Sequence, residues 1–389
     1  MAEAAGAEIV DAALLRTLAA DTDELVVTIA FPTRRAAVQA EENATRLKSA
    51  RKQAGAELAA QGVGAEDAAA LLAPLQSLLG DHELWLHQLD GVLIVLAQGQ
   101  ARVLRLPYPV PERVVVGKAA LLSPLLPSLT DARPFGVLAV SRDHIRLLLA
   151  TRTTVEELDL GDVPTSVADL PGEPATEEPA ALQLRSVGSG DAAIFHGHER
   201  PDFDRLRVEA LFRRVDAGVA PLLDRGLPVV LAGVGENTAL YRSVSRLTGI
   251  VEGTVTGDPA PRRSAQLRDA AWPVVVAALR APAAAALGAL GARQGTGMAV
   301  EDLVEVVTAA RAGRVATLLV GLDDPARGPA VRWGPPAVDD PAQVTAGPPQ
   351  PGEVDLVDAA LRATLLHGGE AYSVPAGDLG GVAAALLRY

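Results

Sequence analysis

Strand-type and helix-type patterns alternate along most of this 389-residue chain. Short apolar runs such as ELVVTIAF, FGVLAV and LPVVLAGV are typical of buried strands, whereas the stretches between them repeat apolar residues at helical spacing. This alternation favours an α/β fold in which helices cover sheets. The chain is also too long for one ordinary core, so we expect two or three domains.

The composition limits how these domains can be stabilised. Apolar residues make up 49% of the chain and aromatic residues only 3%, so Leu, Val and Ala must fill the cores. The chain has no cysteine, which excludes disulfides, thiolate nucleophiles and cysteine-ligated metal sites and fits a reducing compartment. The N-terminal stretch lacks the basic and apolar regions of a secretory signal. We therefore expect a cytoplasmic protein, and we expect no cofactor.

One segment has the composition of a membrane span. It runs from Ala271 to Ala292 and consists largely of alanine. Arg280 lies near its centre, where a charge costs roughly 2.5–3.5 kcal/mol on insertion scales, and the segment also contains two prolines. We therefore expect a buried or amphipathic helix and no membrane association.

Charge argues against general nucleic-acid binding but leaves room for a local site. The formal net charge is −13, which opposes non-specific attraction to phosphate, so we expect no DNA partner. Lysine is nearly absent, so a phosphate-binding site in this chain would consist of arginines.

Arginines are concentrated around a long helix predicted to begin near Phe203. Arg207 and Arg214 are seven positions apart and should share one helix face. Acidic neighbours such as Glu209 and Asp216 could equally neutralise the arginines in ion pairs within the helix. The candidate RNA-binding residues are Arg205, Arg207, Arg213, Arg214, Arg242 and Arg246, and Arg262, Arg263 and Arg268 follow them in sequence.

No complete catalytic motif is present. Two histidines at i and i+2 followed by a carboxylate can bind a metal, and the candidate loop consists of His196, Gly197, His198, Glu199 and Arg200. No third histidine follows at useful spacing, so an exposed loop without metal is favoured.

GVGENTAL imitates the start of a dinucleotide fingerprint but has Thr238 at its third position, which favours a tight strand-to-helix turn.

The order of the segments resembles the bacterial branch of the archaeo-eukaryotic release factors, relatives of the eukaryotic class-one release factor and of Pelota. The resemblance extends along nearly the whole chain. It rests on VTIAFPTRR before a long helix, LLGDHELWLHQLDGVLIVL, FGVLAVSRDHIRLLLATRTTVEELDL, DRLRVEALFRRVDAGVAPLL, PVVLAGVGENTALYR, and GRVATLLV with a closing LRY.

The resemblance implies three α/β domains. Residues 1–130 would form a family-specific N-terminal domain. Residues 131–295 would form an RNase-H-like middle domain with an acidic, proline-rich loop at 160–180. Residues 296–389 would resemble the kink-turn-binding ribosomal-protein fold, with a Pro/Gly-rich loop at 321–352.

The resemblance also suggests a function. In release factors, a loop before the long middle-domain helix carries Gly-Gly-Gln, and the glutamine backbone helps to position water against the peptidyl-tRNA ester. The corresponding stretch here, FHGHERPDFDRLR, keeps only Gly197 and has no glutamine. We therefore expect no hydrolysis of the release-factor type, and an enzymatic role is not favoured.

The favoured hypothesis is a translation-associated factor that binds the ribosome or tRNA in rescue or dormancy. Two alternatives remain open: a metal-dependent nuclease or hydrolase that uses the loop from His196 to Glu199, and a protein-interaction scaffold. The sequence leaves the oligomeric state undetermined.

Overall fold

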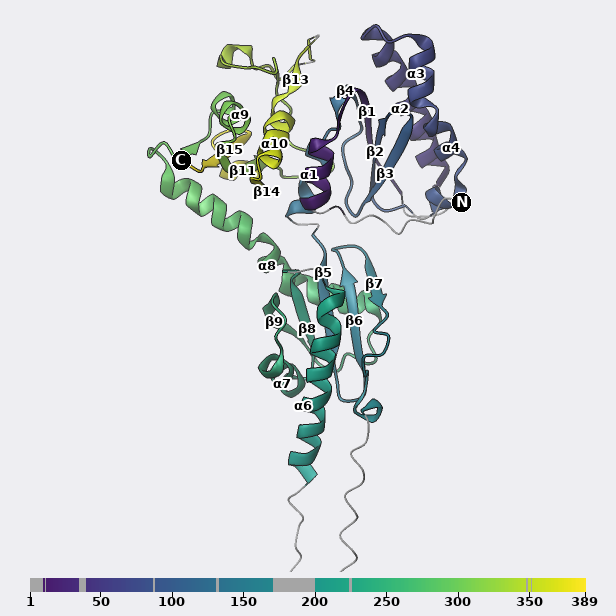
Figure 1. Ribbon diagram of the computed structural model, residues 1–389, viewed down its shortest axis with the longest axis vertical. Helices are drawn as coiled ribbons and strands as arrows, with labels where there is room; N and C mark the ends of the chain where they lie inside the picture. Colours follow the sequence, from purple (N-terminus) through teal and green to yellow (C-terminus); the bar gives the residue numbers. More distant parts are fainter. Residues whose placement is uncertain are drawn as a thin grey trace, which may run out of the picture. The chain divides into compact units, whose positions relative to one another are not determined.

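The computed structural model describes residues 10, 12–34, 40–86, 88–130, 133–170, 200–223, 226–347, 349–350 and 352–389. The chain is a mixed α/β protein with several sheets, as the alternation of patterns predicted (Figure 1). It divides into two compact units: unit 1 contains Met1–Arg133 and Leu279–Tyr389, and unit 2 contains Pro134–Ala278. Unit 2 is therefore an insertion in the sequence of unit 1, and the expected division into three domains remains a prediction.

The N-terminal part of unit 1 is an antiparallel sheet with helices on one face. The strands occur in the order β3-β2-β1-β4. They are β1 (Thr22–Pro32), β2 (Gly91–Ala97), β3 (Gln100–Leu106) and β4 (Arg113–Ala119). The helices that share the core on one face are α2 (Ala40–Ala60), α3 (Ala65–Leu72), α4 (Pro74–Gly80) and α5 (His82–Leu86).

Two local sequence patterns in this part predict elements that do not form. The pattern from Glu66 to Leu79 predicts one helix, but α3 ends at Leu72 and α4 begins at Pro74, because proline cannot donate the hydrogen bond that would continue the helix. A strand was expected from His82, but a short helix forms there. The buried Trp85 indole donates to the carbonyl of Leu78 at 2.7 Å and anchors that helix.

The C-terminal part of unit 1 is a second sheet covered on both faces. Its strand order is β10-β15-β11-β14. The strands are β10 (Ala299–Val300), β11 (Val315–Gly321), β14 (Glu370–Val374) and β15 (Ala383–Leu387). Helices α9 (Leu303–Arg311) and α10 (Leu356–Leu366) share the core on one face, and Ala283, Ala286 and Leu290 pack on the other. The Pro/Gly-rich excursion includes β12 (Trp333–Gly334), which pairs with β13 (Val354–Asp355).

The two parts of unit 1 share one hydrophobic core. Leu15 and Leu18 of α1 (Ala12–Ala20) belong to the same buried cluster as Leu361 of α10. Between the two sheets lies η2 (Ser123–Leu129), a 3₁₀ helix where an interrupted short helix was expected. Arg362 of α10 donates to the carbonyls of Leu18, Ala19 and Ala120, so buried polar contacts join the two parts as well.

Unit 2 contains a five-stranded mixed sheet in the order β7-β6-β5-β8-β9. The strands are β5 (Phe135–Val140), β6 (Ile145–Ala150), β7 (Val155–Leu158), β8 (Val229–Gly233) and β9 (Ile250–Thr256). The first three form the antiparallel meander that the sequence predicted, and β8 and β9 add in parallel to β5. The expected turns near Arg142 and Arg152 are confirmed.

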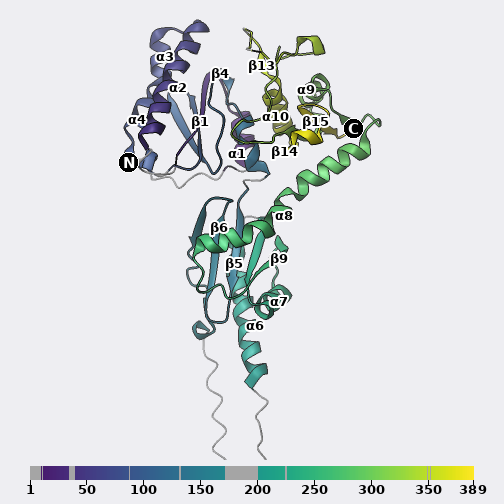
Figure 2. The ribbon, with the colours of Figure 1, turned by 180° about the vertical axis from the view of Figure 1, so that it is seen from behind.

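Helices cover both faces of this sheet. Figure 1 shows α6 (Arg200–Val219) and α7 (Gly235–Val244) on one face, and Figure 2 shows the first half of α8 (Ser264–Arg293) crossing the other. Helix α6 begins three positions before the expected Phe203, and its buried residues Leu211 and Phe212 share a core with β5 and β8. The unit thus has the three-layer arrangement that the alternation predicted.

Helix α8 is long and apolar enough to cross a membrane by length and composition. Its buried residues recur every three or four positions, and they pack against a sheet in each half of the helix. They are Leu267, Ala271, Val275, Leu279, Ala283, Ala286 and Leu290. The helix expected for the segment from Ala271 to Ala292 is confirmed, with one buried stripe along it.

Candidate nucleic-acid interface

The candidate loop lies outside the described part of the chain. His196, Gly197, His198 and Glu199 are not among the described residues, and Arg200 is described only as the first residue of α6. No group of three or more His, Asp or Glu side chains that could hold a metal occurs among the residues that were described.

The arginines of α6 lie on the half of the helix that faces away from the sheet. Val208, Leu211 and Val215 are buried on the other half, and this leaves Arg205, Arg213 and Arg214 exposed. Positions 205, 209 and 213 differ by four and form one stripe along the helix. Within that stripe Arg213 pairs with Glu209 at 2.5 Å, so part of its charge is neutralised.

Arg207 and Arg214 lie on a second stripe, as their spacing predicted. The Arg207 guanidinium donates to the carbonyl of Val167 at 3.2 Å and so ties α6 to the segment that follows β7. Arg214 lines a shallow groove of about 330 Å³ together with Thr165 and Asp169. Hydrogen bonds from Ser166 and Thr165 hold the pKa of the exposed Asp169 carboxyl below its ordinary value. The groove is thus lined by one arginine, Arg214, and by two carboxylates, Asp162 and Asp169.

A buried carboxylate fixes the end of α7 against α6. Asp216 accepts hydrogen bonds from the Tyr241 hydroxyl at 3.1 Å, from the Ser245 hydroxyl, and from the backbone N–H of Arg246 at 2.8 Å. Burial and the charge of Asp216 raise the pKa of Tyr241. The last of these hydrogen bonds holds the backbone of the exposed Arg246 against α6. The sequence suggested Asp216 only as a partner that might neutralise arginines.

Other arginines of unit 2 are engaged in the fold. Arg242 donates to the carbonyls of Val251 at 2.9 Å and Glu252 at 3.0 Å, which ties α7 to β9. Arg262 donates to the carbonyl of Thr256, and Arg268 pairs with Asp269. Arg242 and Arg262 are thereby explained as structural.

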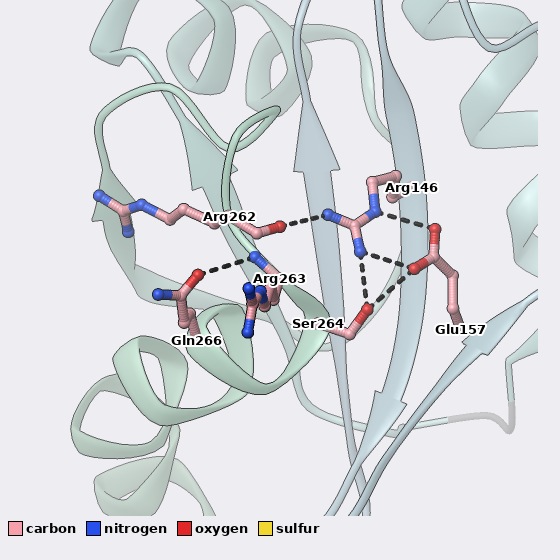
Figure 3. Close-up of polar contacts among 6 residues, drawn as sticks. All are labelled: Arg146, Glu157, Arg262, Arg263, Ser264 and Gln266. Atoms are coloured by element: carbon pink, nitrogen blue, oxygen red, sulfur yellow. Dashed lines mark hydrogen bonds and ion pairs between the residues drawn. The ribbon is translucent and has the colours of Figure 1, made fainter.

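A polar network at the start of α8 was missed by sequence reasoning. Arg146 of β6 donates to both oxygens of Glu157, to the carbonyl of Arg262 and to the Ser264 hydroxyl (Figure 3). The Ser264 hydroxyl also donates to Glu157 at 2.9 Å. The hydrogen bonds from Arg146 hold the pKa of Glu157 below its ordinary value. Because every nitrogen of Arg146 has a partner, this network fixes α8 to the meander and offers no free cation.

The described part of unit 2 therefore contains two kinds of arginine. Arg207, Arg213 and Arg242 of the predicted set have protein partners. Arg205, Arg214, Arg246 and Arg263 are exposed and have no side-chain partner among the residues described. This second group provides the uncompensated charge on the α6–α7 side and at the start of α8.

The two glycines of GVGENTAL have different roles, and only Gly233 serves packing between strands. A Cβ atom at Gly233 would lie 2.6 Å from the carbonyl oxygen of Val140, so only glycine allows β8 to approach β5 this closely. Gly235 begins α7 after Val234. The predicted tight turn from strand to helix is confirmed.

Residues 134–314 match the family described as bacterial archaeo-eukaryotic release factor family 3. Over these residues the chain is similar to the bacterial archaeo-eukaryotic release factors. The match confirms the resemblance that the sequence indicated, and it relates the chain to translation factors. It covers unit 2 and extends into the C-terminal part of unit 1.

Solved structures of release factors and Pelota proteins are also similar to the chain. An archaeal translation termination factor is 16% identical, with 97% of each chain covered and a TM-score of 0.25. Archaeoglobus fulgidus Pelota is 14% identical, with 77% of this chain and 79% of that chain covered and a TM-score of 0.29. A model of ribosome-bound archaeal Pelota and ABCE1 is 13% identical, with coverage of 77% and 78% and a TM-score of 0.39. TM-scores this low do not establish a shared fold, and no curated protein matches the chain.

Proposed function

We propose that this bacterial release-factor relative is a cytoplasmic, translation-associated factor that binds the ribosome or tRNA in rescue or dormancy. The observation that carries the proposal is the set of exposed arginines on α6 and just after α7 that form no ion pair among the described residues, within the segment that matches the family. Arginine binds phosphate through paired N–H donors, and these contacts position a protein on RNA without reading its sequence.

Because the net charge is −13, a local group of exposed arginines is stronger support for RNA binding than it would be in a basic protein. An acidic chain is repelled by RNA at long range, so binding has to come from a defined patch. Arg205, Arg214 and Arg246 supply exposed positive charge for such a site, because none of them has a side-chain partner among the described residues.

The proposal includes the finer fold assignment. For residues 131–295 we propose an RNase-H-like middle domain, supported by the strand order β7-β6-β5-β8-β9, in which an antiparallel meander is extended by two parallel strands. For residues 296–389 we propose a fold like that of the kink-turn-binding ribosomal proteins, and residues 1–130 would be the family-specific domain.

The proposed factor acts by binding rather than by hydrolysis. Residues 196–200 read His-Gly-His-Glu-Arg, where a release factor would carry Gly-Gly-Gln. Without that tripeptide the glutamine backbone group that orients water is missing. An occupied ribosome would therefore keep its peptidyl-tRNA ester intact.

Co-sedimentation with purified ribosomes at moderate salt tests the proposal. The variant Arg205→Ala/Arg214→Ala/Arg246→Ala removes three exposed charges that make no described side-chain contact, and we expect its affinity to fall at least tenfold. Its salt dependence should also weaken, because fewer counterions are released. The control Lys48→Ala/Lys52→Ala/Arg327→Ala removes the same charge from exposed positions in unit 1 and should bind like the wild type. Absence of the wild type from the ribosomal fraction, or equal loss in both variants, would refute the proposal.

A further inference from the structure

Unit 1 has a basic surface with an exposed aromatic ring where α9, α10 and β15 end. It consists of Arg311, Arg314, His367, Arg388 and Tyr389, and is called here the Arg314–Tyr389 surface. Arg311 ends α9, His367 follows α10, and Arg388 and Tyr389 follow β15. Segments that are far apart in sequence thus meet at one place.

Hydrogen bonds hold these segments together. The backbone N–H of Arg388 donates to the carbonyl of Arg314 at 2.8 Å, and the Arg388 guanidinium donates to the carbonyl of His367 at 2.7 Å. The Arg314 guanidinium donates to the carbonyl of Tyr389 at 3.3 Å and lies 6.0 Å from the centre of the Tyr389 ring. The ring and both guanidinium groups are therefore preorganised on one surface.

A glycine allows this close meeting. Gly313 ends α9 with φ near +70°, a conformation that other residues adopt at a cost. A Cβ atom at Gly313 would lie 3.2 Å from the His367 ring, so the chain reverses tightly beside that ring. The reversal brings Arg311 and Arg314 to the same end of the sheet.

No Asp or Glu side chain forms an ion pair with the arginines of this surface in the described part of unit 1. Arg311 is exposed, Arg388 donates to the neutral carbonyl of His367, and Arg314 contacts the backbone oxygen and the ring of Tyr389. Glu370, which follows His367 closely in sequence, accepts a hydrogen bond from the Tyr372 hydroxyl. A concentration of positive charge in a chain of net charge −13 indicates an anionic partner.

The apolar part of the surface narrows the class of partner. The Tyr389 side chain is 70% exposed, and the nearby Leu366 is 51% exposed. An exposed ring beside arginines is the arrangement on which nucleic-acid bases stack while guanidinium groups bind the adjoining phosphates. An acidic peptide would use the charges but would leave the face of the ring with no specific role.

We propose that the Arg314–Tyr389 surface binds single-stranded RNA, with a base stacked on Tyr389 and phosphates bound by Arg311, Arg314 and Arg388. This site lies in unit 1, whereas the α6 arginines lie in unit 2, so it does not depend on the proposed function. It would give the chain a second, sequence-tolerant RNA contact.

Fluorescence anisotropy with the full chain and a labelled 12-nucleotide oligo(A) RNA at low salt tests the proposal. We expect Tyr389→Ala to weaken binding about 5- to 150-fold, the range for loss of one stacked base, and Tyr389→Phe to retain it. Arg311→Glu should weaken binding and lower the salt dependence, because one phosphate contact is lost. The fold should be unaffected, because the exposed Arg311 has no described contact to lose. The control Arg327→Glu, at an exposed position elsewhere in unit 1, should have little effect.

The outcomes separate this site from the α6 site. The proposal is supported if the variant Arg205→Ala/Arg214→Ala/Arg246→Ala still binds RNA and Tyr389→Ala does not. This holds even if the wild type does not bind ribosomes. Three results would overturn it: no RNA binding by the wild type, equal binding by the wild type and Tyr389→Ala when thermal unfolding shows both folded, or tighter binding of a labelled acidic peptide than of RNA.

Discussion

The Asp358 carboxylate accepts a hydrogen bond from the backbone N–H of Leu122 at 2.7 Å, across 236 positions of sequence. The same oxygen accepts the N–H of Ser123 at 2.7 Å. Asp358 is 8% exposed, and burial raises its pKa above the ordinary value, although the partly buried Arg362 of the same helix acts in the opposite direction. This buried group joins the N-terminal and C-terminal parts of unit 1, which share a core although unit 2 separates them in sequence.

Replacing Asp358 by alanine should destabilise unit 1 by about 3–5 kcal/mol, because it removes one partner of a buried charge and leaves two backbone N–H groups without an acceptor. Urea unfolding followed by tryptophan fluorescence measures the change. Asp339→Ala, at an exposed position, is the matched control and should change stability by less than about 0.5 kcal/mol. Equal stability of both variants would show that Asp358 does not join the two parts.

Asp355 should make the stability of unit 1 depend on pH. Burial, and next the neighbouring Asp358, raise the pKa of Asp355 to about 7, although Arg113 acts in the opposite direction. A raised pKa means that the folded state binds the proton more tightly than the unfolded state does. The contribution of this group to stability is therefore complete below about pH 4 and is lost as the pH rises towards 7.

The variant Asp355→Asn isolates this effect, because asparagine carries no titrating proton. Relative to the wild type, the variant should gain on the order of 2–4 kcal/mol between pH 4 and pH 8. Urea unfolding at intervals of one pH unit measures the difference. A difference that is flat across this range, or that changes in the opposite direction, would contradict the raised pKa.

Gly233→Ala should destabilise unit 2 by about 1–3 kcal/mol, because the added methyl group would meet the Val140 carbonyl at 2.6 Å and force β8 away from β5. Gly235→Ala is the matched control two positions further on. No atom lies within 4 Å of its Cβ position, and alanine favours the helix that begins there. Thermal unfolding should therefore rank Gly233→Ala below the wild type and Gly235→Ala at or above it.

The chain should not release peptide from peptidyl-tRNA on the ribosome. The stretch at 196–200 lacks the tripeptide that orients water in release factors, so turnover should equal the uncatalysed background. A release assay with pre-loaded ribosomes measures this, with an authentic release factor as the positive control. Robust turnover that disappears in His198→Ala would instead assign hydrolytic chemistry to this loop.

Local patterns predicted much of the fold. The strands at FGVLAV and LPVVLAGV, the long helix α6 and the turn from β8 into α7 were all predicted, because apolar periodicity and glycine act over a few neighbouring residues. The same local reasoning failed at His82, where a short helix replaces the expected strand. That outcome depends on the burial of Trp85 in a core built by distant segments.

The sequence predicted which arginines belong to the candidate interface but not which of them are paired with other groups in the fold. The sequence placed Arg205, Arg213 and Arg214 on one helix, yet it could not show which of them would be neutralised. Arg242 was identified as a candidate and is occupied by the carbonyls of β9, whereas Arg146 was not identified and is the centre of a network. Contacts of this kind join residues that only the folded chain brings together.

By itself, the sequence determined the α/β class, the aliphatic cores, the absence of a Gly-Gly-Gln tripeptide and the family resemblance, because each of these is a property of composition or of short segments. Only the tertiary structure decided which arginines remain uncompensated, how Asp358 reaches Leu122, and that Arg314, Arg388 and Tyr389 form one surface. The physical reason is that hydrogen bonds and charge neutralisation depend on distances in space, which are set by the packing of whole sheets and helices.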